Sequence, residues 1–240
     1  MSTTAIIVNT TIKSITRFIC RVDDDQLKRI PERGPLILVT NHINFLEVPL
    51  IYTHLQPRPI TGFAKAETWD NPVFRPLFNM WGAIPLRRGE ADVQAIRRCL
   101  DALHQGKIIG IAPEGTRSGT GKLQRGLPGV VFLAMQSGAP LLPLVYYGNE
   151  LFKENIVRLK RTDFKIVVGQ MFRINSSQTK ITKELRRKIT DEIMYQIAAL
   201  LPPEYRGAYS DLSLATESFL IFEPPSISNI TFSQSQISSR

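Results

Sequence analysis

The chain has no long hydrophobic run. None of its apolar stretches approaches the roughly 18 consecutive apolar residues that a membrane-spanning helix requires. The N-terminus also lacks the early positive charge and the small-residue cleavage site of a secretory signal. We therefore expect a cytoplasmic location, with any membrane contact peripheral and on the inner face of the membrane.

Cysteine is scarce as well. The two cysteines, Cys20 and Cys99, lie far apart in the sequence and match no spacing typical of metal ligands. We expect both to be reduced thiols, and we expect no bound metal.

Acidic residues are outnumbered by basic ones. Thirty lysines and arginines against twenty-one aspartates and glutamates give a net charge of +9. Such a surplus suits an anionic partner, whether a nucleic acid, a phosphorylated substrate or an acidic membrane surface. The sequence shows no recognition motif for nucleic acids and no interleaving of aromatic and basic residues, so we expect no nucleic-acid partner.

The first 22 residues have the pattern of an amphipathic helix. Apolar residues recur at steps of three and four at Ala5, Val8, Ile12, Ile15, Ile19 and Val22, and a basic stripe follows at Lys13, Arg17 and Arg21. Two uses of this helix remain open. It lies on an anionic membrane with its cations toward the lipid head groups, or it packs on its own domain.

The rest of the chain alternates apolar runs with amphipathic stretches. Strands are predicted at 34–40, 59–66, 82–86, 107–112, 140–147 and 163–169, and helices at 46–55, 71–81, 90–106, 127–137 and 182–201. This alternation predicts an α/β domain over residues 23–210, with a largely parallel mixed sheet covered by helices. Residues 211–240 are rich in serine and show no sustained period, so we expect a disordered tail in which 219–222 is a docking segment.

A histidine and a glutamate lie five positions apart in "TNHINFLE", directly after the strand at 34–40. A neutral His42 can take a proton from an alcohol if a carboxylate such as Glu47 fixes its tautomer. In a continuous helix the two side chains would point about 140° apart. They meet only if His42 lies in a loop and Glu47 in the first helical turn. By itself the spacing is weak evidence, because a histidine beside a strand is often a structural hydrogen-bonding residue.

A second polar loop, "PEGTRSGTGKLQRG" at 113–126, follows the strand at 107–112. Its glycines expose backbone N–H groups and its cations add positive charge, which together favour an anion such as phosphate. The loop is not a Walker motif, because five residues separate Gly115 from Gly121 and Lys122 precedes leucine. An ATPase is therefore excluded.

Together these motifs resemble those of a known family. The blocks "NHINFLE", "GAIPLRR", "PEGTRS" and "PLLPL" stand in the order and spacing of the glycerolipid acyltransferases, of the 1-acylglycerol-3-phosphate acyltransferase type. The resemblance covers roughly residues 33–147 and makes the domain at 23–210 an acyltransferase domain. The first block resembles the family's N-H-x₄-D motif, and the third nearly repeats its F-P-E-G-T-R-S motif.

The resemblance implies an acyl transfer in phospholipid synthesis. His42 would deprotonate the hydroxyl of lysophosphatidic acid, which would attack the thioester of acyl-CoA or acyl carrier protein, and Glu47 would orient His42. No cofactor beyond the acyl donor is implied. The alternatives are another lysophospholipid, glycerol phosphate or another acceptor, or a catalytically impaired protein that binds membrane lipids.

The same resemblance assigns the substrate-binding residues. The matching positions are Arg88, with Arg87 as a rival, Glu114, Gly115, Thr116, Arg117, Lys65 and Pro143. The third block corresponds to the family's glycerol-phosphate site, while Pro143 has either a structural role or a share in the acyl-donor site. One departure from the family pattern bears on catalysis: Glu47 stands where aspartate is usual. The extra methylene must shift the hydrogen bond to His42 by about one bond length, on a scale to which catalysis is sensitive.

Overall fold

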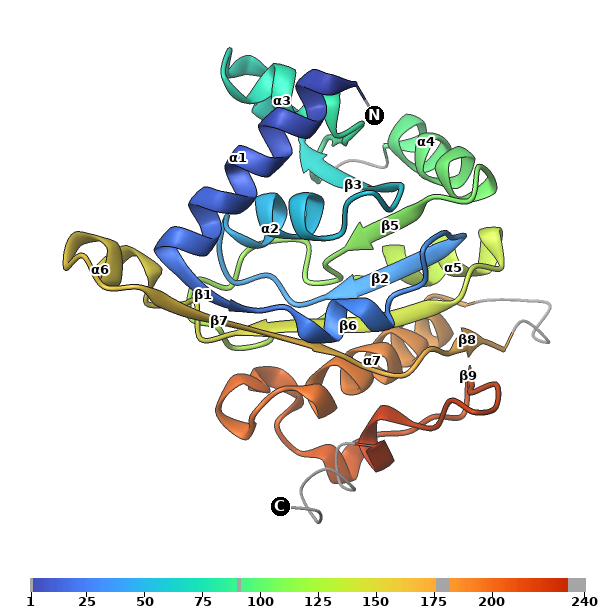
Figure 1. Ribbon diagram of the computed structural model, residues 1–240. Helices are drawn as coiled ribbons and strands as arrows, with labels where there is room; N and C mark the ends of the chain where they lie inside the picture. The colour runs from blue at the N-terminus through green and yellow to red at the C-terminus, as the bar shows by residue number, and fades with distance from the viewer. Residues whose placement is uncertain (1, 90–91, 176–181, 233–240) are drawn as a thin grey trace.

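A seven-stranded sheet forms the centre of the molecule in the computed structural model, which describes residues 2–89, 92–175 and 182–232 (Figure 1). The strands are Cys20–Asp23 (β1), Leu36–Thr40 (β2), Ile60–Lys65 (β3), Ile84–Leu86 (β4), Ile108–Ile111 (β5), Leu141–Tyr147 (β6) and Thr162–Val168 (β7). Their order is β1-β7-β6-β2-β5-β3-β4. All neighbours pair in parallel except β6 and β7. The predicted largely parallel mixed sheet is confirmed.

The register of the central strands places the polar loops at one edge of the sheet. In the parallel ladders Val39 of β2 pairs with Ile111 of β5 and with Pro143 of β6. The strands β2 and β5 therefore end within one residue of each other, and β6 runs three residues past the partner of Thr40, to Tyr147, at the same edge of the sheet. In an α/β sheet this carboxyl edge is where ligands and chemistry are found.

Helices cover both faces of the sheet. The helices are Thr3–Ile19 (α1), Glu47–His54 (α2), Phe74–Met80 (α3), Val93–His104 (α4), Gly129–Ser137 (α5), Phe152–Val157 (α6) and Lys183–Leu200 (α7). Short 3-10 helices lie at Asp25–Arg29, Ala66–Asp70, Pro203–Tyr205, Gly207–Tyr209 and Leu212–Leu214. Alternate side chains of β2 enter two cores: Ile37 and Val39 pack with α4, α5 and α7, while Leu36 and Leu38 pack with α2. Burial on both faces explains why the central strands read as continuous apolar runs.

The N-terminal helix is shorter than predicted. It ends at Ile19, and Cys20–Asp23 form the edge strand β1, parallel to β7. Cys20 is buried while Arg21 is exposed, so the residues alternate as in a strand. The spacing of the apolar residues could not reveal that the helix gives way to a strand, because Val22 also fits the apolar positions of a helix.

Helix α1 packs on the domain, which is one of the two uses left open by the sequence. It lies against α2 and buries Ala5, Asn9 and Thr16. The basic stripe is largely occupied by ion pairs: Arg17 contacts Asp24 at 2.6 Å and Arg21 contacts Asp163 at 2.7 Å. The side chains of Ile7, Ile15 and Phe18 remain exposed.

The serine-rich C-terminal segment differs from its prediction over residues 211–232. A short strand Leu220–Ile221 (β9) pairs with Arg173–Ile174 (β8), and Phe219 and Phe222 pack on the core, so 219–222 does form a docking segment. The carboxylate of Glu192 on α7 accepts hydrogen bonds from Thr216, Ser218 and Phe219. Polar residues that indicated disorder thus find partners on α7, which composition could not reveal. Residues 233–240 of the predicted tail lie outside the described residues.

Among the described residues, no helix combines the length and the apolar character that a membrane-spanning segment needs.

Candidate active site

His42 and Glu47 meet at the carboxyl edge of the sheet. β2 ends at Thr40, His42 lies in the loop that follows, and α2 begins at Glu47. The Nδ1 atom of His42 and the Oε2 atom of Glu47 are 2.8 Å apart. The two side chains meet in the arrangement that the sequence requires, with the histidine in a loop and the carboxylate in the first helical turn.

The carboxylate of Glu47 is buried and surrounded by donors. Only 4% of the residue is exposed. The backbone N–H of Asn44 donates to both oxygens, at 3.0 and 3.1 Å, and the side-chain amide of Asn149 donates to Oε1 at 2.6 Å. A buried carboxylate needs such donors, because loss of water penalises its charged form. Two asparagines therefore set the orientation of the carboxylate toward His42.

Asn149 is a site residue that the sequence analysis missed. It is fully buried and follows Gly148, whose positive φ of 88° turns the chain after β6. Its carbonyl accepts a hydrogen bond from the side-chain amide of Asn44 at 2.8 Å, so the two asparagines also hold each other. The rule that pointed to His42, a polar residue just beyond a strand, applies equally to Asn149.

Glu114 joins the two polar loops. One of its oxygens accepts a hydrogen bond from the backbone N–H of His42 at 2.7 Å, and the other accepts one from the N–H of Gln124 at 2.9 Å. The N–H of Ser118 donates in turn to the carbonyl of His42 at 2.7 Å. Burial raises the pKa of Glu114, although the backbone donors oppose this effect. The histidine loop and the "PEGTRS" loop are therefore bound together at their backbones.

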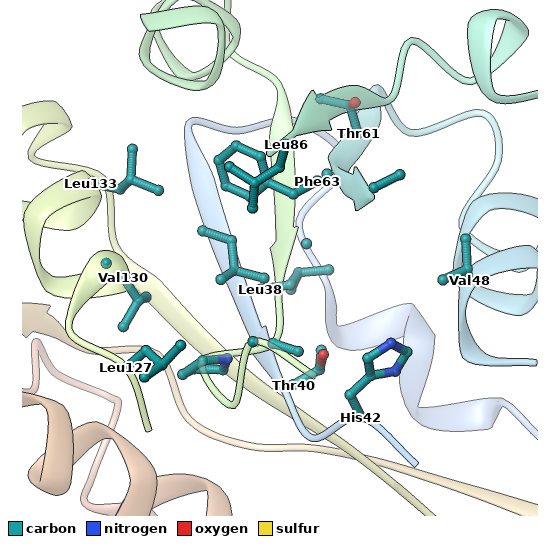
Figure 2. Close-up of a pocket in the computed structure, with 18 of the residues that line it drawn as sticks. Leu38, Thr40, His42, Val48, Thr61, Phe63, Leu86, Leu127, Val130 and Leu133 are labelled. Atoms are coloured by element: carbon teal, nitrogen blue, oxygen red, sulfur yellow. The ribbon is translucent and has the colours of Figure 1, made fainter. Parts of the chain in front are cut away.

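An apolar cavity of about 510 Å³ opens beside His42. Its apolar lining includes Leu38, Val48, Ile51, Phe63, Leu86, Val130 and Leu133. In Figure 2, Thr40 and His42 lie at one end of the cavity and Phe63 and Leu86 at the other. An apolar cavity with a histidine at one end suits a ligand with a long apolar chain and a reactive head.

Cations line the wall of this cavity as well. Within the described part of the chain, these are Lys65, Arg88 and Arg186. The ammonium of Lys65 lies 3.1 Å from the carboxylate of Glu67, but both side chains are more than half exposed and hold each other weakly. Arg87, the rival of Arg88, does not line the cavity. Arg186 comes from α7, outside the four motifs, and no pattern in the sequence pointed to it.

The remaining predicted residues occupy different positions. Gly115 lines the cavity with a φ of +70°, and a Cβ there would come within 2.6 Å of Leu127. Thr116 and Arg117 are exposed in the loop, and neither they nor Glu114 line the cavity. Pro143 is buried within β6, in the interior of the sheet and away from the cavity wall. This position corresponds to the structural alternative for Pro143.

The family model named Acyltransferase matches residues 21–147, more than half of the chain. The chain belongs to this acyltransferase family. The resemblance seen in the four motifs is therefore confirmed, and the matched region contains both loops of the site.

Curated relatives of this acyltransferase-family chain carry related names. A chloroplastic 1-acyl-sn-glycerol-3-phosphate acyltransferase of Brassica napus is 30% identical over 181 residues, covering 72% of this chain and 51% of the relative. The enzyme of the same name from Bacillus subtilis is 26% identical, covering 60% and 69%. A lyso-ornithine lipid O-acyltransferase of Pseudomonas aeruginosa is 29% identical, covering 47% and 43%. The chain spans about half the length of the relatives from Brassica napus and Pseudomonas aeruginosa.

A solved structure shares the fold. The crystal structure of the 1-acyl-sn-glycerophosphate acyltransferase PlsC from Thermotoga maritima superposes with a TM-score of 0.54. The match covers 76% of each chain at 22% sequence identity. At that identity the likeness supports the α/β architecture of this acyltransferase-family chain and nothing finer.

Proposed function

We propose that this protein transfers a fatty acyl group from an acyl thioester to the free hydroxyl of lysophosphatidic acid. One observation carries the proposal. The Nδ1 atom of His42 is engaged by the buried carboxylate of Glu47, while the same histidine lines an apolar cavity that also has cations on its wall. A base, an apolar chain site and an anion site thus occur together.

The proton path follows from the tautomer that the carboxylate selects. With Nδ1–H donating to Glu47, the Nε2 atom of His42 carries the lone pair. Nε2 takes the proton of the acceptor hydroxyl as its oxygen attacks the thioester carbonyl. The tetrahedral intermediate then expels the thiolate, which takes the proton from the imidazolium. The ester forms, the thioester breaks, and His42 returns to its neutral state without an acyl-enzyme.

Asn44 and Asn149 act as positioning residues in this mechanism. Both bind the carboxylate of Glu47, and neither hydrogen-bonds to His42. They allow the longer glutamate to take the place of the family's aspartate, because its carboxylate is held against rotation. Glu47 in turn holds the imidazole and stabilises its protonated form.

The cavity and its cations accommodate the two substrates. The apolar walls hold an acyl chain, and Arg88, Lys65 and Arg186 provide charge for the phosphate of the acceptor. Arg117 adds charge from the exposed loop beside His42. Glu114 acts by fixing that loop, since both of its oxygens are bound to backbone N–H groups and a carboxylate would repel phosphate. Acyl-CoA and acyl carrier protein both remain donor candidates.

Lyso-ornithine lipid is the second candidate acceptor. The relative from Pseudomonas aeruginosa carries that name and is 29% identical over 113 residues. We favour lysophosphatidic acid because the cations on the cavity wall match a phosphate. The alternative of a lipid-binding protein without catalysis is less favoured, because the His42–Glu47 pair is intact.

The test is a direct assay of acyl transfer. Purified protein is incubated with labelled acyl-CoA or acyl carrier protein and a panel of acceptors that includes lysophosphatidic acid and lyso-ornithine lipid, and the products are identified by mass. We expect His42→Ala to reduce transfer by about 100-fold or more, in the range attributed to a general base. The matched control is His104→Ala, an exposed histidine on α4, which should retain full activity. Undiminished transfer by His42→Ala would refute the mechanism.

A further inference from the structure

The most exposed large apolar side chains of the described residues gather at one place. Leu159 is 95% exposed, Val157 83% and Phe18 81%. Single exposed apolar residues are ordinary on a protein surface, but a cluster of them marks an interaction site. These three come from two segments far apart in the sequence.

The parallel pairing of two strands brings those segments together. Cys20, at the start of β1, pairs with Thr162, at the start of β7. The guanidinium of Arg161 donates to the carbonyls of Arg17 and Cys20, at 2.7 and 2.8 Å. The end of α1 therefore lies beside the segment 157–161 that leads from α6 into β7 (Figure 1). We call Phe18 together with residues 157–161 the docking tip.

The charge around the docking tip is positive. Arg158 and Lys160 are exposed, and within the described residues neither forms an ion pair. Lys153 on α6 is exposed beside them, and Glu154 is the single carboxylate in the segment 151–161. Exposed apolar side chains surrounded by cations are the pattern by which proteins bind the surface of an anionic bilayer, because insertion and attraction to head groups act together.

The docking tip lies at the same edge of the sheet as His42. β7 runs antiparallel to β6, so its first residues lie beside the carboxyl end of β6, where Asn149 follows. Phe152, the first residue of α6, packs edge-on against Phe45 in the histidine loop, with ring centres 5.7 Å apart. Phe45 is itself 45% exposed and continues the apolar surface toward the active site.

We propose that the docking tip inserts Phe18, Val157 and Leu159 into an anionic lipid bilayer and so presents the catalytic edge of the sheet to membrane-borne acceptor. The role of this contact in presenting the acceptor rests on the proposed function. The binding of the docking tip to a bilayer does not. The proposal also moves the membrane contact from the predicted basic stripe, where Arg17 and Arg21 are paired, to a surface that the sequence did not indicate.

Binding to vesicles tests the proposal without catalysis. Full-length protein is sedimented with vesicles of phosphatidylcholine, with or without phosphatidylglycerol. The variant Val157→Ser/Leu159→Asn removes apolar surface without straining the backbone, because Leu159 has a φ of +54° that asparagine adopts more readily. We expect its affinity for anionic vesicles to fall by about tenfold or more, since two exposed apolar side chains no longer insert. Phe18→Ser alone should produce a smaller loss.

Matched controls separate the docking tip from exposed apolar surface in general. Leu214→Ser/Ile227→Ser removes two exposed apolar side chains from the C-terminal segment, and it should bind vesicles as the wild type does. Arg158→Glu/Lys160→Glu should lose the preference for phosphatidylglycerol and the sensitivity to salt. Wild-type binding by Val157→Ser/Leu159→Asn, or an equal loss in the control, would overturn the proposal. So would a change in oligomeric state by light scattering without a change in vesicle binding, which would assign the tip to a second copy of the chain.

Acyl transfer is measured separately on the same proteins. With a water-soluble, short-chain acceptor, the docking-tip variants should be as active as the wild type, because none of the substituted residues lines the cavity. Reduced transfer to this acceptor would count against the proposal, because it would show that the tip supports the site itself. If no acceptor is acylated but vesicle binding changes as expected, the proposed function fails and the docking tip stands.

Discussion

At the scale of single residues, the departure from the family motif at Glu47 has a local explanation. The side-chain oxygen of Asn44 accepts a hydrogen bond from the backbone N–H of Leu46 at 2.9 Å and so turns the chain before α2. In this turn the backbone N–H of Asn44 points at the carboxylate of Glu47. Asn149 holds the same carboxylate from the end of β6. The hydrogen bonds from Asn44 and Asn149 therefore restrain the additional rotatable bond of the glutamate.

Replacement of Asn149 by alanine tests this explanation. The amide of Asn149 donates to a charged oxygen at 2.6 Å, and such a bond contributes about 1.5–3 kcal/mol. We expect kcat to fall by about 10- to 100-fold with KM little changed, because the amide acts on the base and not on the bound substrate. Steady-state kinetics and a pH profile of kcat for Asn149→Ala measure this effect.

Two comparisons make the test specific. In a Glu47→Gln background, Asn149→Ala should add little further loss, because residues that act through one another are not additive. Asn155→Ala is the matched control. The side-chain amide of Asn155 donates to the hydroxyl of Thr162 and not to Glu47, so this variant should retain kcat. Fully additive losses in the double variant would show that Asn149 acts independently of Glu47.

At the scale of elements, α1 is a built-in part of the domain. It buries Asn9 against Trp81, whose indole N–H donates to the Oδ1 atom of Asn9 at 2.9 Å. Trp81 in turn stacks on Tyr52 of α2, with ring centres 4.7 Å apart. A helix that left the domain to lie on a membrane would break this buried hydrogen bond.

Substitution of Asn9 by leucine measures how firmly α1 is held. The change keeps a similar size but leaves the indole N–H of Trp81 without its buried acceptor, at a cost of about 1–3 kcal/mol. We expect the free energy of unfolding in urea to fall by that amount. Thr10→Leu, at the exposed neighbouring position, is the control and should unfold like the wild type. Equal stability of all three proteins would mean that α1 contributes little to the fold.

At the scale of the whole molecule, sequence patterns predicted the central elements and missed the peripheral ones. The runs at β2, β5 and β6 are almost entirely apolar because helices cover both faces, and this composition is visible without a structure. The sequence pattern placed β1 at the end of the N-terminal helix. It did not predict α6, because the six residues of α6 are too few to reveal a helical period in its apolar residues.

The residues of the candidate site also fall into those that the sequence revealed and those that it missed. His42, Glu47 and Glu114 belong to short motifs of consecutive residues, so the sequence revealed them. Asn149 and Arg186 reach the site through the pairing of β6 and the packing of α7, which depend on the whole fold. The sequence also could not show that Glu114 serves the backbone of the loops, because this role depends on where two loops meet.

Global stability should depend on pH through His54, a buried histidine on α2. Burial lowers the pKa of His54 to about 4, with Lys13 adding to the effect, whereas the unfolded chain keeps a value near 6.5. Between these values the unfolded state binds a proton that the folded state does not. The free energy of unfolding should therefore fall by about 2 kcal/mol from pH 7.5 to pH 5 on account of this group. Urea unfolding of the wild type at both pH values measures the fall.

Variants of two histidines isolate this contribution. His54→Gln removes the titrating group and should show a smaller loss of stability toward pH 5. His104→Gln, at an exposed position on α4, should keep the wild-type dependence. An identical pH dependence in the wild type and His54→Gln would show that other groups account for the change.

The backbone bonds between the two polar loops have a consequence for regiochemistry. Glu114, Ser118 and Gly119 fasten the "PEGTRS" loop to His42 and Ile43 at three points. The histidine and this loop are therefore held together as one unit. Under the proposed function, an acceptor phosphate bound by Arg117 would lie at a set separation from His42. The glycerol carbon that is acylated would then follow from the spacing of the two loops and not from the shape of the pocket that holds the chain.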